Sequence, residues 1–198
     1  MISIKNVFLD NLNYPISFKV QPGHCLGIMG DSGIGKTRLL RVIADLEESP
    51  GIITFNDLDS YQYDPTVWRS MISYLAAESL WWFDIVKDHF ISRNSLNLEK
   101  LHLQKSILSK PVVELSTGER QRLALLRLLN HNTPEVLLLD EPTSALDDNN
   151  TKILEDYILS LKTNSNLPVI WVSHDLNQIE RVSDRAIKLT TNKVIEII

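Results

Sequence analysis

Residues 30–37 have the types and spacing of a loop that binds phosphate. They read Gly30-Asp31-Ser32-Gly33-Ile34-Gly35-Lys36-Thr37 and fit the pattern G-x-x-x-x-G-K-[ST]. Glycines allow successive backbone N–H groups to turn inward, where they and the positive end of a following helix form a concavity for an anion. We expect Lys36 to contact the β- and γ-phosphates of a nucleoside triphosphate and the Thr37 hydroxyl to bind Mg²⁺.

The segments on either side of this loop supply the context that the chemistry needs. Residues 25–29 form a short apolar run closed by a glycine, which predicts a buried strand, and residues 37–44 carry apolar side chains at helical spacing. The alternative is a glycine-rich turn with an exposed lysine. Strand, loop and helix together favour phosphate binding. The residues expected at the nucleotide are Gly30, Asp31, Ser32, Gly33, Ile34, Gly35, Lys36, Thr37 and Arg38.

A pair of carboxylates forms the second candidate for chemistry. Asp140 and Glu141 follow the apolar run 136–139, so they lie at the carboxyl end of a predicted buried strand, where open α/β sheets bind ligands. We expect Asp140 to reach the Mg²⁺ beside the phosphate loop and Glu141 to orient or deprotonate the attacking water. The alternative is an acidic turn that caps a helix, and the phosphate loop makes it the weaker interpretation.

Composition limits the class of protein. The 198 residues fit one domain, and the formal net charge of −5 lacks the basic character usual in nucleic-acid binders, so no nucleic-acid partner is expected. The single cysteine, Cys25, permits no internal disulfide and suits a reducing compartment. We see no signal peptide and no apolar run long enough to cross a bilayer, so a membrane role requires a partner.

The order of the predicted elements indicates an α/β fold with a mostly parallel sheet. Predicted strands alternate with helices along the chain, as in open parallel sheets. Residues 1–29 are predicted to be β structure. Residues 76–130 are more polar and mainly helical in pattern, and they end in an amphipathic helix over 119–130.

Three further motifs carry a family resemblance. Residues 115–122, Leu-Ser-Thr-Gly-Glu-Arg-Gln-Arg, resemble the LSGGQ-type signature of ATP-binding cassette (ABC) ATPases. Residues 140–147 resemble that family's Walker B strand end and D-loop, and residues 173–175, Ser-His-Asp, resemble its switch histidine. With the phosphate loop, four motifs occur in the family's order over nearly the whole chain. The chain is therefore similar to the small stand-alone ATP-binding subunits of ABC transporters.

The resemblance implies a fold and a domain division. The fold is a P-loop NTPase of ABC type, with a mostly parallel sheet core, an N-terminal antiparallel β subdomain and an inserted α-helical subdomain. A single ABC ATPase domain would span 1–198, with a core over about 1–75 and 131–198 and a helical subdomain over about 76–130.

The resemblance also implies a shared reaction centre. ATP and Mg²⁺ would be the cofactors, and two cassettes would meet head to tail, each ATP lying between one chain's phosphate loop and the other's signature. Ser116, Thr117, Gly118 and Glu119 would serve in trans. His174 would contact the γ-phosphate and support Glu141, and Asp147 would bridge the cassettes. Residues 116–119 also fit an ordinary helix cap, and both interpretations can hold together.

Two positions depart from the family pattern. Ala77 stands where the family usually has the Q-loop glutamine, and a methyl group cannot bind a metal or water. Either Glu78 or an ordered water replaces the glutamine, or a shell of waters makes it dispensable. The aromatic that usually stacks on adenine is also not evident: Tyr14 and Phe8 are the candidates, and alternation favours a core position for Phe8 at least equally.

Trp81, Trp82 and Phe83 open the expected helical subdomain, where transporters of this family receive their membrane subunit. Three adjacent aromatics cannot all face one core, so we expect at least one at the surface or an interface.

The leading interpretation is the ATPase subunit of an ABC transporter, held at the cytoplasmic face of the membrane by an integral membrane transporter subunit. One alternative is an ABC ATPase acting on nucleic acid or ribosomes. The other is a nucleotide-binding module without turnover, which the presence of Glu141 and His174 opposes.

Overall fold

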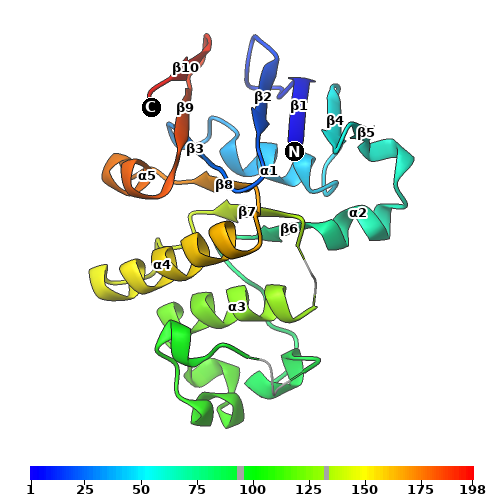
Figure 1. The fold of residues 1–198 in the computed structure, drawn as a ribbon. Coiled ribbons are helices and arrows are strands. Elements are labelled where there is room, and N and C mark those ends of the chain that lie inside the picture. The colour runs from blue at the N-terminus through cyan, green and yellow to red at the C-terminus, as the bar shows by residue number, and fades with distance from the viewer. Residues whose placement is uncertain (93–95, 132–133) are drawn as a thin grey trace.

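Two β-sheets and a set of helices make up the chain (Figure 1). The structure is a computed structural model that describes residues 1–92, 96–131 and 134–198. The smaller sheet is antiparallel, in the order β2-β1-β4-β5. Its strands are β1 (Ile2–Val7), β2 (Ile16–Val20), β4 (Ile52–Phe55) and β5 (Leu58–Asp59). This is the antiparallel N-terminal part that the sequence predicts.

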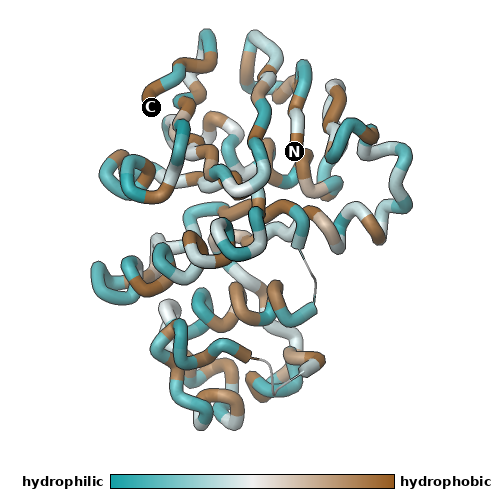
Figure 2. Tube along the Cα trace, in the orientation of Figure 1, coloured by the Kyte–Doolittle hydropathy of each residue, from teal (hydrophilic) through white to brown (hydrophobic). Residues whose placement is uncertain are grey.

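The larger sheet has the order β10-β9-β3-β8-β7-β6, and all its pairs are parallel except β10 with β9. Its strands are β3 (Cys25–Gly30), β6 (Ile72–Leu75), β7 (Val136–Asp140), β8 (Val169–Val172), β9 (Arg185–Leu189) and β10 (Val194–Glu196). The central strands are buried on both faces, which explains their continuous apolar sequence. Figure 2 shows hydrophobic stretches in these strands and also in bands along the helices that pack on them.

Helices cover the two faces of the larger sheet, and successive strand residues point to opposite sides. Helix α1 (Lys36–Ile43) packs with the antiparallel sheet on one face, where Leu138 and Ile170 join its core. On the other face, Leu139 and Trp171 pack with helices α3 (Thr117–His131), α4 (Asp148–Asn164) and α5 (Leu176–Val182). Helix α2 (Pro65–Met71) leads into β6. Within the described ranges, every helix falls short of the length and hydrophobicity that a membrane span requires.

The segment between β6 and α3 differs from the helical pattern expected for it. Its helices, as far as the described residues 76–92 and 96–116 show, are short 3₁₀ helices: η2 (Val86–His89), η3 (Glu99–Leu101), η4 (Lys105–Ser109) and η5 (Val112–Glu114). An earlier 3₁₀ helix, η1 (Ser60–Gln62), precedes α2. One reason is local: the backbone N–H groups of Trp82 and Phe83 donate to the His89 ring instead of to carbonyls four residues earlier. The α-helical part of this region is α3, which includes the predicted 119–130.

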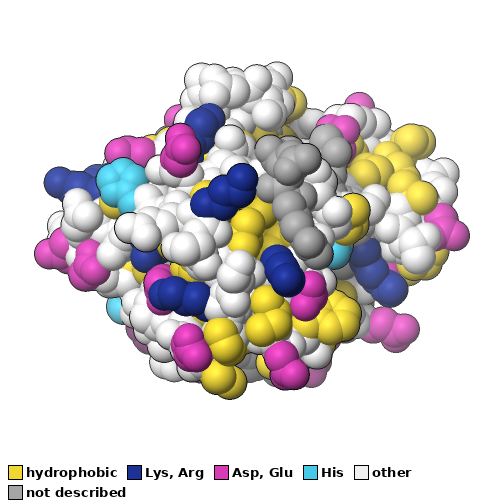
Figure 3. Space-filling model, turned by 90° about the horizontal axis from the view of Figure 1, so that it is seen from below, with side chains coloured by type: hydrophobic (Ala, Val, Ile, Leu, Met, Phe, Trp, Pro, Cys, Tyr) yellow, Lys and Arg dark blue, Asp and Glu magenta, His cyan; other side chains and the backbone are white. Residues whose placement is uncertain are grey.

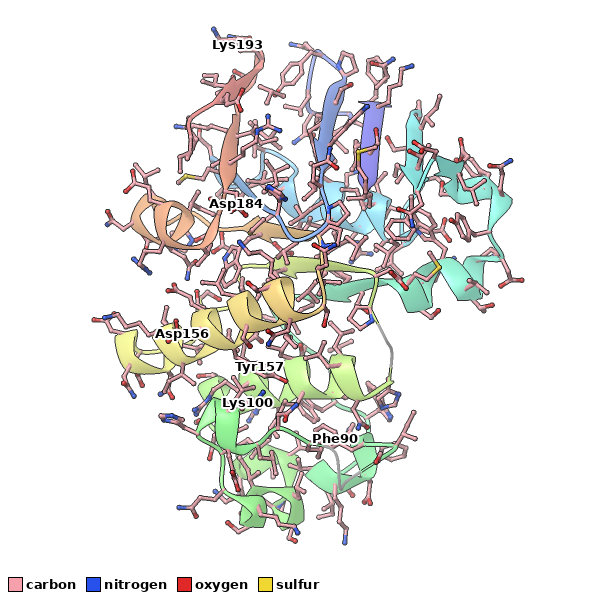
Figure 4. All side chains as sticks on the ribbon, viewed as in Figure 1. Phe90, Lys100, Asp156, Tyr157, Asp184 and Lys193 are labelled. Carbon is pink, nitrogen blue, oxygen red and sulfur yellow. The ribbon has the colours of Figure 1, made fainter. Side chains whose placement is uncertain are left out.

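Helix α4 and this segment meet through side chains that Figure 4 labels. The Lys100 ammonium of η3 lies 5.9 Å from the centre of the Tyr157 ring of α4, a cation–π contact.

The predicted fold class, an α/β fold with a mostly parallel sheet and an N-terminal antiparallel sheet, is confirmed. The division of 1–198 into a core over 1–75 and 131–198 and a subdomain over 76–130 stays a prediction.

Candidate functional site

The phosphate loop joins β3 to α1 and has a backbone that glycine makes possible. Gly30 has φ +153°, and a Cβ there would lie 2.8 Å from the Leu189 carbonyl oxygen. Gly35, with φ +104°, precedes the first residue of α1, and no side chain of the described residues caps that helix. The first amides of α1 therefore lack a side-chain acceptor at the helix end, where an anion is most favoured.

Lys36 folds back over this loop. Its Nζ donates to the carbonyl oxygen of Gly30 at 2.7 Å and to that of Asp31 at 3.1 Å. The positive charge is thus held at the loop by two backbone carbonyls. The contact of Lys36 with phosphates stays a prediction.

A cavity of about 620 Å³ opens above the phosphate loop and brings the two predicted motifs together. Asp140 and Glu141 line it with Lys36 and Thr37. Its full lining is Asn11, Ser32, Gly33, Gly35, Lys36, Thr37, Arg38, Arg41, Glu47, Asp140 and Glu141. Three residues expected at the nucleotide, Gly30, Asp31 and Ile34, are outside this lining, and Ile34 packs in the core.

The chemistry of Thr37 and Asp140 fits a magnesium ion. A hydroxyl and a carboxylate are hard oxygen donors, and Mg²⁺ is usually held by one or two such groups together with waters and substrate phosphates. Asp140 is 2% exposed and accepts a hydrogen bond from the Tyr74 hydroxyl at 3.0 Å. Burial, and then the negative charge of Asp140, raise the pKa of Tyr74, which keeps the phenol protonated as a donor.

Glu141 and His174 form an ion-pair geometry at the edge of the cavity. The Oε2 of Glu141 lies 2.9 Å from the Nδ1 of His174. Glu141 has φ +47°, and its backbone N–H donates to the Val172 carbonyl at 3.1 Å, which turns its side chain out of the strand. Glu141 and His174 also line a second cavity of about 480 Å³, so Glu141 stands between the two cavities.

The predicted signature lies elsewhere and caps α3. The Ser116 backbone N–H donates to Glu119 Oε2 at 2.8 Å, and the Glu119 N–H donates to Ser116 Oγ at 3.1 Å, which is a capping box. Burial acts to raise the pKa of Glu119, but the Ser116 donors and the charge of Lys110 outweigh it and lower that pKa. None of residues 116–119, all of which the structure describes, lines either cavity. Within one chain, the structure keeps Ser116 apart from the phosphate loop.

Asp147 begins α4 as its N-cap. It accepts the backbone N–H of Asn150 at 2.8 Å and the Asn150 side-chain amide at 2.7 Å, and these bonds lower the pKa of its exposed carboxyl. Arg122 of α3 donates to the Asn150 side chain at 2.6 Å. The signature helix and the D-loop are therefore linked through one asparagine.

The structure places the residues next to the missing Q-loop glutamine and the two candidates for stacking on adenine. Glu78 is exposed and is not among the described residues that line the first cavity. The expectation of a core position for Phe8 is wrong: its side chain is 45% exposed. A register shift in β1 between Ile4 and Val7, with φ +53° at Asn6, resets the alternation. Tyr14 packs against the core and donates to the Thr190 carbonyl.

Several residues at the site escape analysis of the sequence. Asn11 lines the cavity and donates to the Gly33 carbonyl at 2.8 Å, and Glu47 pairs with Arg38 and Arg41 on the same wall. Asn11, Arg41 and Glu47 lie outside the motifs recognised in the sequence, whereas Arg38 is among the residues expected at the nucleotide. The phosphate-loop motif implies that other side chains surround the nucleotide, but the motif does not say which; the fold identifies them.

The aromatic run after β6 forms a cluster around His89 and Arg127. His89, 1% exposed, accepts the N–H groups of Trp82 and Phe83 at its Nε2. The Arg127 guanidinium lies 4.4 Å and 4.6 Å from the ring centres of Trp81 and Trp82. Trp82 is 60% and Phe83 50% exposed, which confirms that at least one of these aromatics lies at the surface.

The sequence profile of the family described as ABC transporter matches residues 14–144. The chain therefore belongs to the ABC transporter family, in which it is an ATP-binding cassette. It is 35% identical over 194 residues to the probable iron export ATP-binding protein FetA of Escherichia coli (strain K12), covering 91% of this chain and 84% of FetA. It is also 35% identical over 196 residues to Protein STAR1 of Oryza sativa subsp. japonica, covering 92% of this chain but only 56% of that protein.

Solved structures show the same fold at lower sequence identity. The dimeric post-hydrolysis ATP-binding cassette MJ0796, bound to ADP and Pi, superposes with a TM-score of 0.83 at 21% identity, over 99% of this chain and 98% of that chain. A bacterial Atm1-family ABC exporter with ATP bound gives a TM-score of 0.86 at 24% identity, over 98% of this chain and 38% of that chain.

Proposed function

We propose that this chain hydrolyses ATP as one half of a cassette dimer and powers transport through a separate integral membrane subunit. The observation that carries the proposal is the Glu141–His174 pair, 2.9 Å apart, at the edge of a cavity that also holds the phosphate loop. A module that only binds nucleotide needs no oriented carboxylate beside the phosphates.

The residues of the cavity divide the chemistry between them. The amides at the start of α1 and the Lys36 ammonium bind the phosphates, and Thr37 with Asp140 would hold Mg²⁺, which supplies charge neutralisation at the phosphoryl group. Glu141 accepts a proton from the water whose oxygen attacks the γ-phosphorus, while the bond to the β-phosphate oxygen breaks. His174 holds the Glu141 carboxylate in place.

The position of the signature supports a dimer. Ser116 and Gly118 line neither cavity of their own chain, as the structure describes it, so they are available to a second cassette. The start of α3 would then offer amide N–H groups to the γ-phosphate across the interface. The likeness to a dimeric cassette bound to ADP and Pi is consistent with this arrangement.

The surface of the segment between β6 and α3, called the insert below, supports a membrane partner. Leu80, Trp82 and Phe83 are exposed beside one another in sequence, and Arg127 donates to the Leu80 carbonyl at 2.8 Å and so anchors them. Seen from below, this end of the molecule carries apolar, basic and acidic side chains intermixed (Figure 3). This aromatic surface would receive the membrane subunit and hold the chain at the cytoplasmic face. The net charge of −5 disfavours the alternative of nucleic acid.

The deciding experiment compares the purified chain with Glu141→Gln. Loss of the base is expected to reduce hydrolysis by about 10²- to 10⁴-fold while ATP binding is kept, and ATP should drive the variant into dimers detectable by light scattering. Asp156→Asn, at an exposed position midway along α4 (Figure 4), serves as the acid-to-amide control. A Glu141→Gln variant that stays monomeric at saturating ATP, alone and beside its membrane subunit, contradicts the proposal.

Docking is tested separately by Trp82→Ala and Phe83→Ala. Each should abolish co-purification with the membrane protein encoded in the neighbouring reading frame and leave the fold of the isolated chain intact. Val113→Ala, at an even more exposed apolar position between β6 and α3, is the control. Unchanged co-purification of both aromatic variants rules out this surface as the docking site.

A further inference from the structure

Tyr74 lies on β6, on the face of the sheet that α1 covers. It is opposite Leu138 in the parallel register of β6 and β7, and Leu138 packs against the core that includes α1. Asp140 comes two residues after Leu138 and so points to the same face. The two strands thus place a phenol and the predicted metal-binding carboxylate on one side of the sheet.

The contact between these side chains is direct. The Tyr74 hydroxyl donates to Oδ2 of Asp140 at 3.0 Å, in surroundings where Asp140 is 2% exposed. A hydrogen bond from a neutral donor to a buried carboxylate is stronger than one between neutral groups and restricts the rotation of the carboxylate. The bond at Oδ2 thus holds the carboxylate in one orientation, in which it would bind a metal.

The loop after β6 offers no such support. Ala77 has no polar group, and Glu78 is outside the described lining of the cavity. Gln121 of α3 donates to the Ala76 carbonyl at 3.4 Å, so this amide is engaged with the backbone of the loop. The polar group that this strand contributes to the metal-binding carboxylate is therefore the Tyr74 hydroxyl, three residues before Ala77.

We propose that Tyr74 is a positioning residue for Mg²⁺: it fixes the Asp140 carboxylate so that the chain binds the magnesium complex of ATP in preference to ATP alone. The inference rests on the proposed function, because it assumes that Asp140 binds the metal. Partners that orient a metal ligand typically change metal affinity by about 10- to 100-fold when they are removed.

The test measures binding of ATP to the full chain by calorimetry, with Mg²⁺ and with EDTA, without reference to turnover. Tyr74→Phe removes one oxygen and keeps the ring. It should lower the preference for the magnesium complex by about tenfold and leave the affinity for metal-free ATP unchanged. Tyr63→Phe is the matched control, because the Tyr63 hydroxyl donates to the Phe55 carbonyl away from the cavity.

A double-mutant cycle distinguishes loss of the Tyr74–Asp140 hydrogen bond from a general disturbance of the fold. In an Asp140→Asn background, Tyr74→Phe should have no further effect on the magnesium preference, since the acceptor charge is already lost. If Tyr74→Phe binds both forms of ATP as the wild type does, or weakens both equally, the positioning role is overturned while the proposed function stands. If the wild type binds ATP equally with Mg²⁺ and with EDTA, the proposed metal site is overturned as well.

Discussion

The side-chain amide of Gln178 in α5 donates to the hydroxyl of Thr143 at 2.8 Å. This bond ties the helix that follows His174 to the loop that follows Glu141. The same nitrogen donates to Glu155 at 2.8 Å, and Arg181 pairs with Glu155 at 2.8 Å. Gln178 and Glu155 are 3% and 4% exposed, so the centre of this network is buried, while Arg181 at its edge is partly exposed.

Replacement of Gln178 by alanine should affect both stability and turnover. It leaves the buried Glu155 carboxylate with fewer donors and frees the loop at Thr143, so we expect a loss of about 1–3 kcal/mol in the free energy of unfolding and slower ATP hydrolysis. Urea denaturation and a phosphate-release assay check this. Asn177→Ala, at an exposed position of the same helix, is the control. Equal behaviour of the two variants would show that the network does not stabilise the site.

Ser116 should have two separable roles, because its hydroxyl caps α3 and is also predicted to meet ATP on a second chain. Ser116→Ala should cost about 1 kcal/mol of stability and also abolish ATP-driven dimer formation in the Glu141→Gln background. Glu119→Gln keeps an acceptor for the Ser116 N–H and should lose less than 1 kcal/mol with dimer formation intact. Thermal unfolding and light scattering measure the two properties. Normal dimers with Ser116→Ala would limit Ser116 to a capping role.

The stability of the chain should fall as the pH drops through the range where histidine titrates. Burial, and then the charge of Arg127, lower the pKa of His89, and this outweighs the opposing influence of Asp88 and of the carbonyls of Ile85 and Val86. The unfolded chain then binds more protons than the folded chain below about pH 6.5. The stabilisation is therefore complete above that pH and is lost as the pH falls through the lower pKa of the folded state.

Urea denaturation at pH 7.5 and 5.5 tests this expectation. The wild type should lose on the order of 1 kcal/mol more between these values than His89→Gln, whose amide oxygen can still accept an N–H. His24→Gln, at an exposed histidine, should behave like the wild type. If the stability of the His89 variant and of the wild type changes identically with pH, His89 is not the source of the pH dependence.

Two glycines of the phosphate loop should differ in their tolerance of alanine. Gly30→Ala places a Cβ 2.8 Å from the Leu189 carbonyl oxygen and 2.9 Å from Ile34, so we expect a loss of about 2–4 kcal/mol and weak ATP binding. Gly33→Ala meets nothing within 4 Å and should cost only about 1–2 kcal/mol, for its φ of +78°. Thermal unfolding ranks the stability of the two variants. Equal losses of stability would show that the positive φ, and not the clash of the Cβ, sets the cost of alanine.

The sequence predicts those parts of the molecule that local patterns determine. The phosphate loop has fixed spacing, and the strand before Asp140 is a continuous apolar run, so both sites follow from neighbouring residues. Strand order is a long-range property. Tyr74 and Asp140 are 66 positions apart, and only the pairing of β6 with β7 brings their side chains together.

Other differences arise where a single residue changes the backbone. The left-handed conformation at Asn6 shifts the register of β1 and exposes Phe8, which strict alternation directs inward. In the insert, His89 accepts backbone N–H groups from Trp82 and Phe83 and thereby replaces the helix that periodicity predicts. Both effects are local, but neither follows from the periodicity of the apolar residues on which the prediction rests.

The aromatic surface has an optical consequence. Of the four tryptophans of the chain, Trp68 and Trp171 are 1% and 0% exposed, Trp81 is partly exposed and Trp82 is 60% exposed. The intrinsic fluorescence therefore has a buried and an exposed origin, and the emission of Trp82 should respond most when another protein covers this surface. A shift of that emission to shorter wavelength would report the arrival of a membrane subunit without any label.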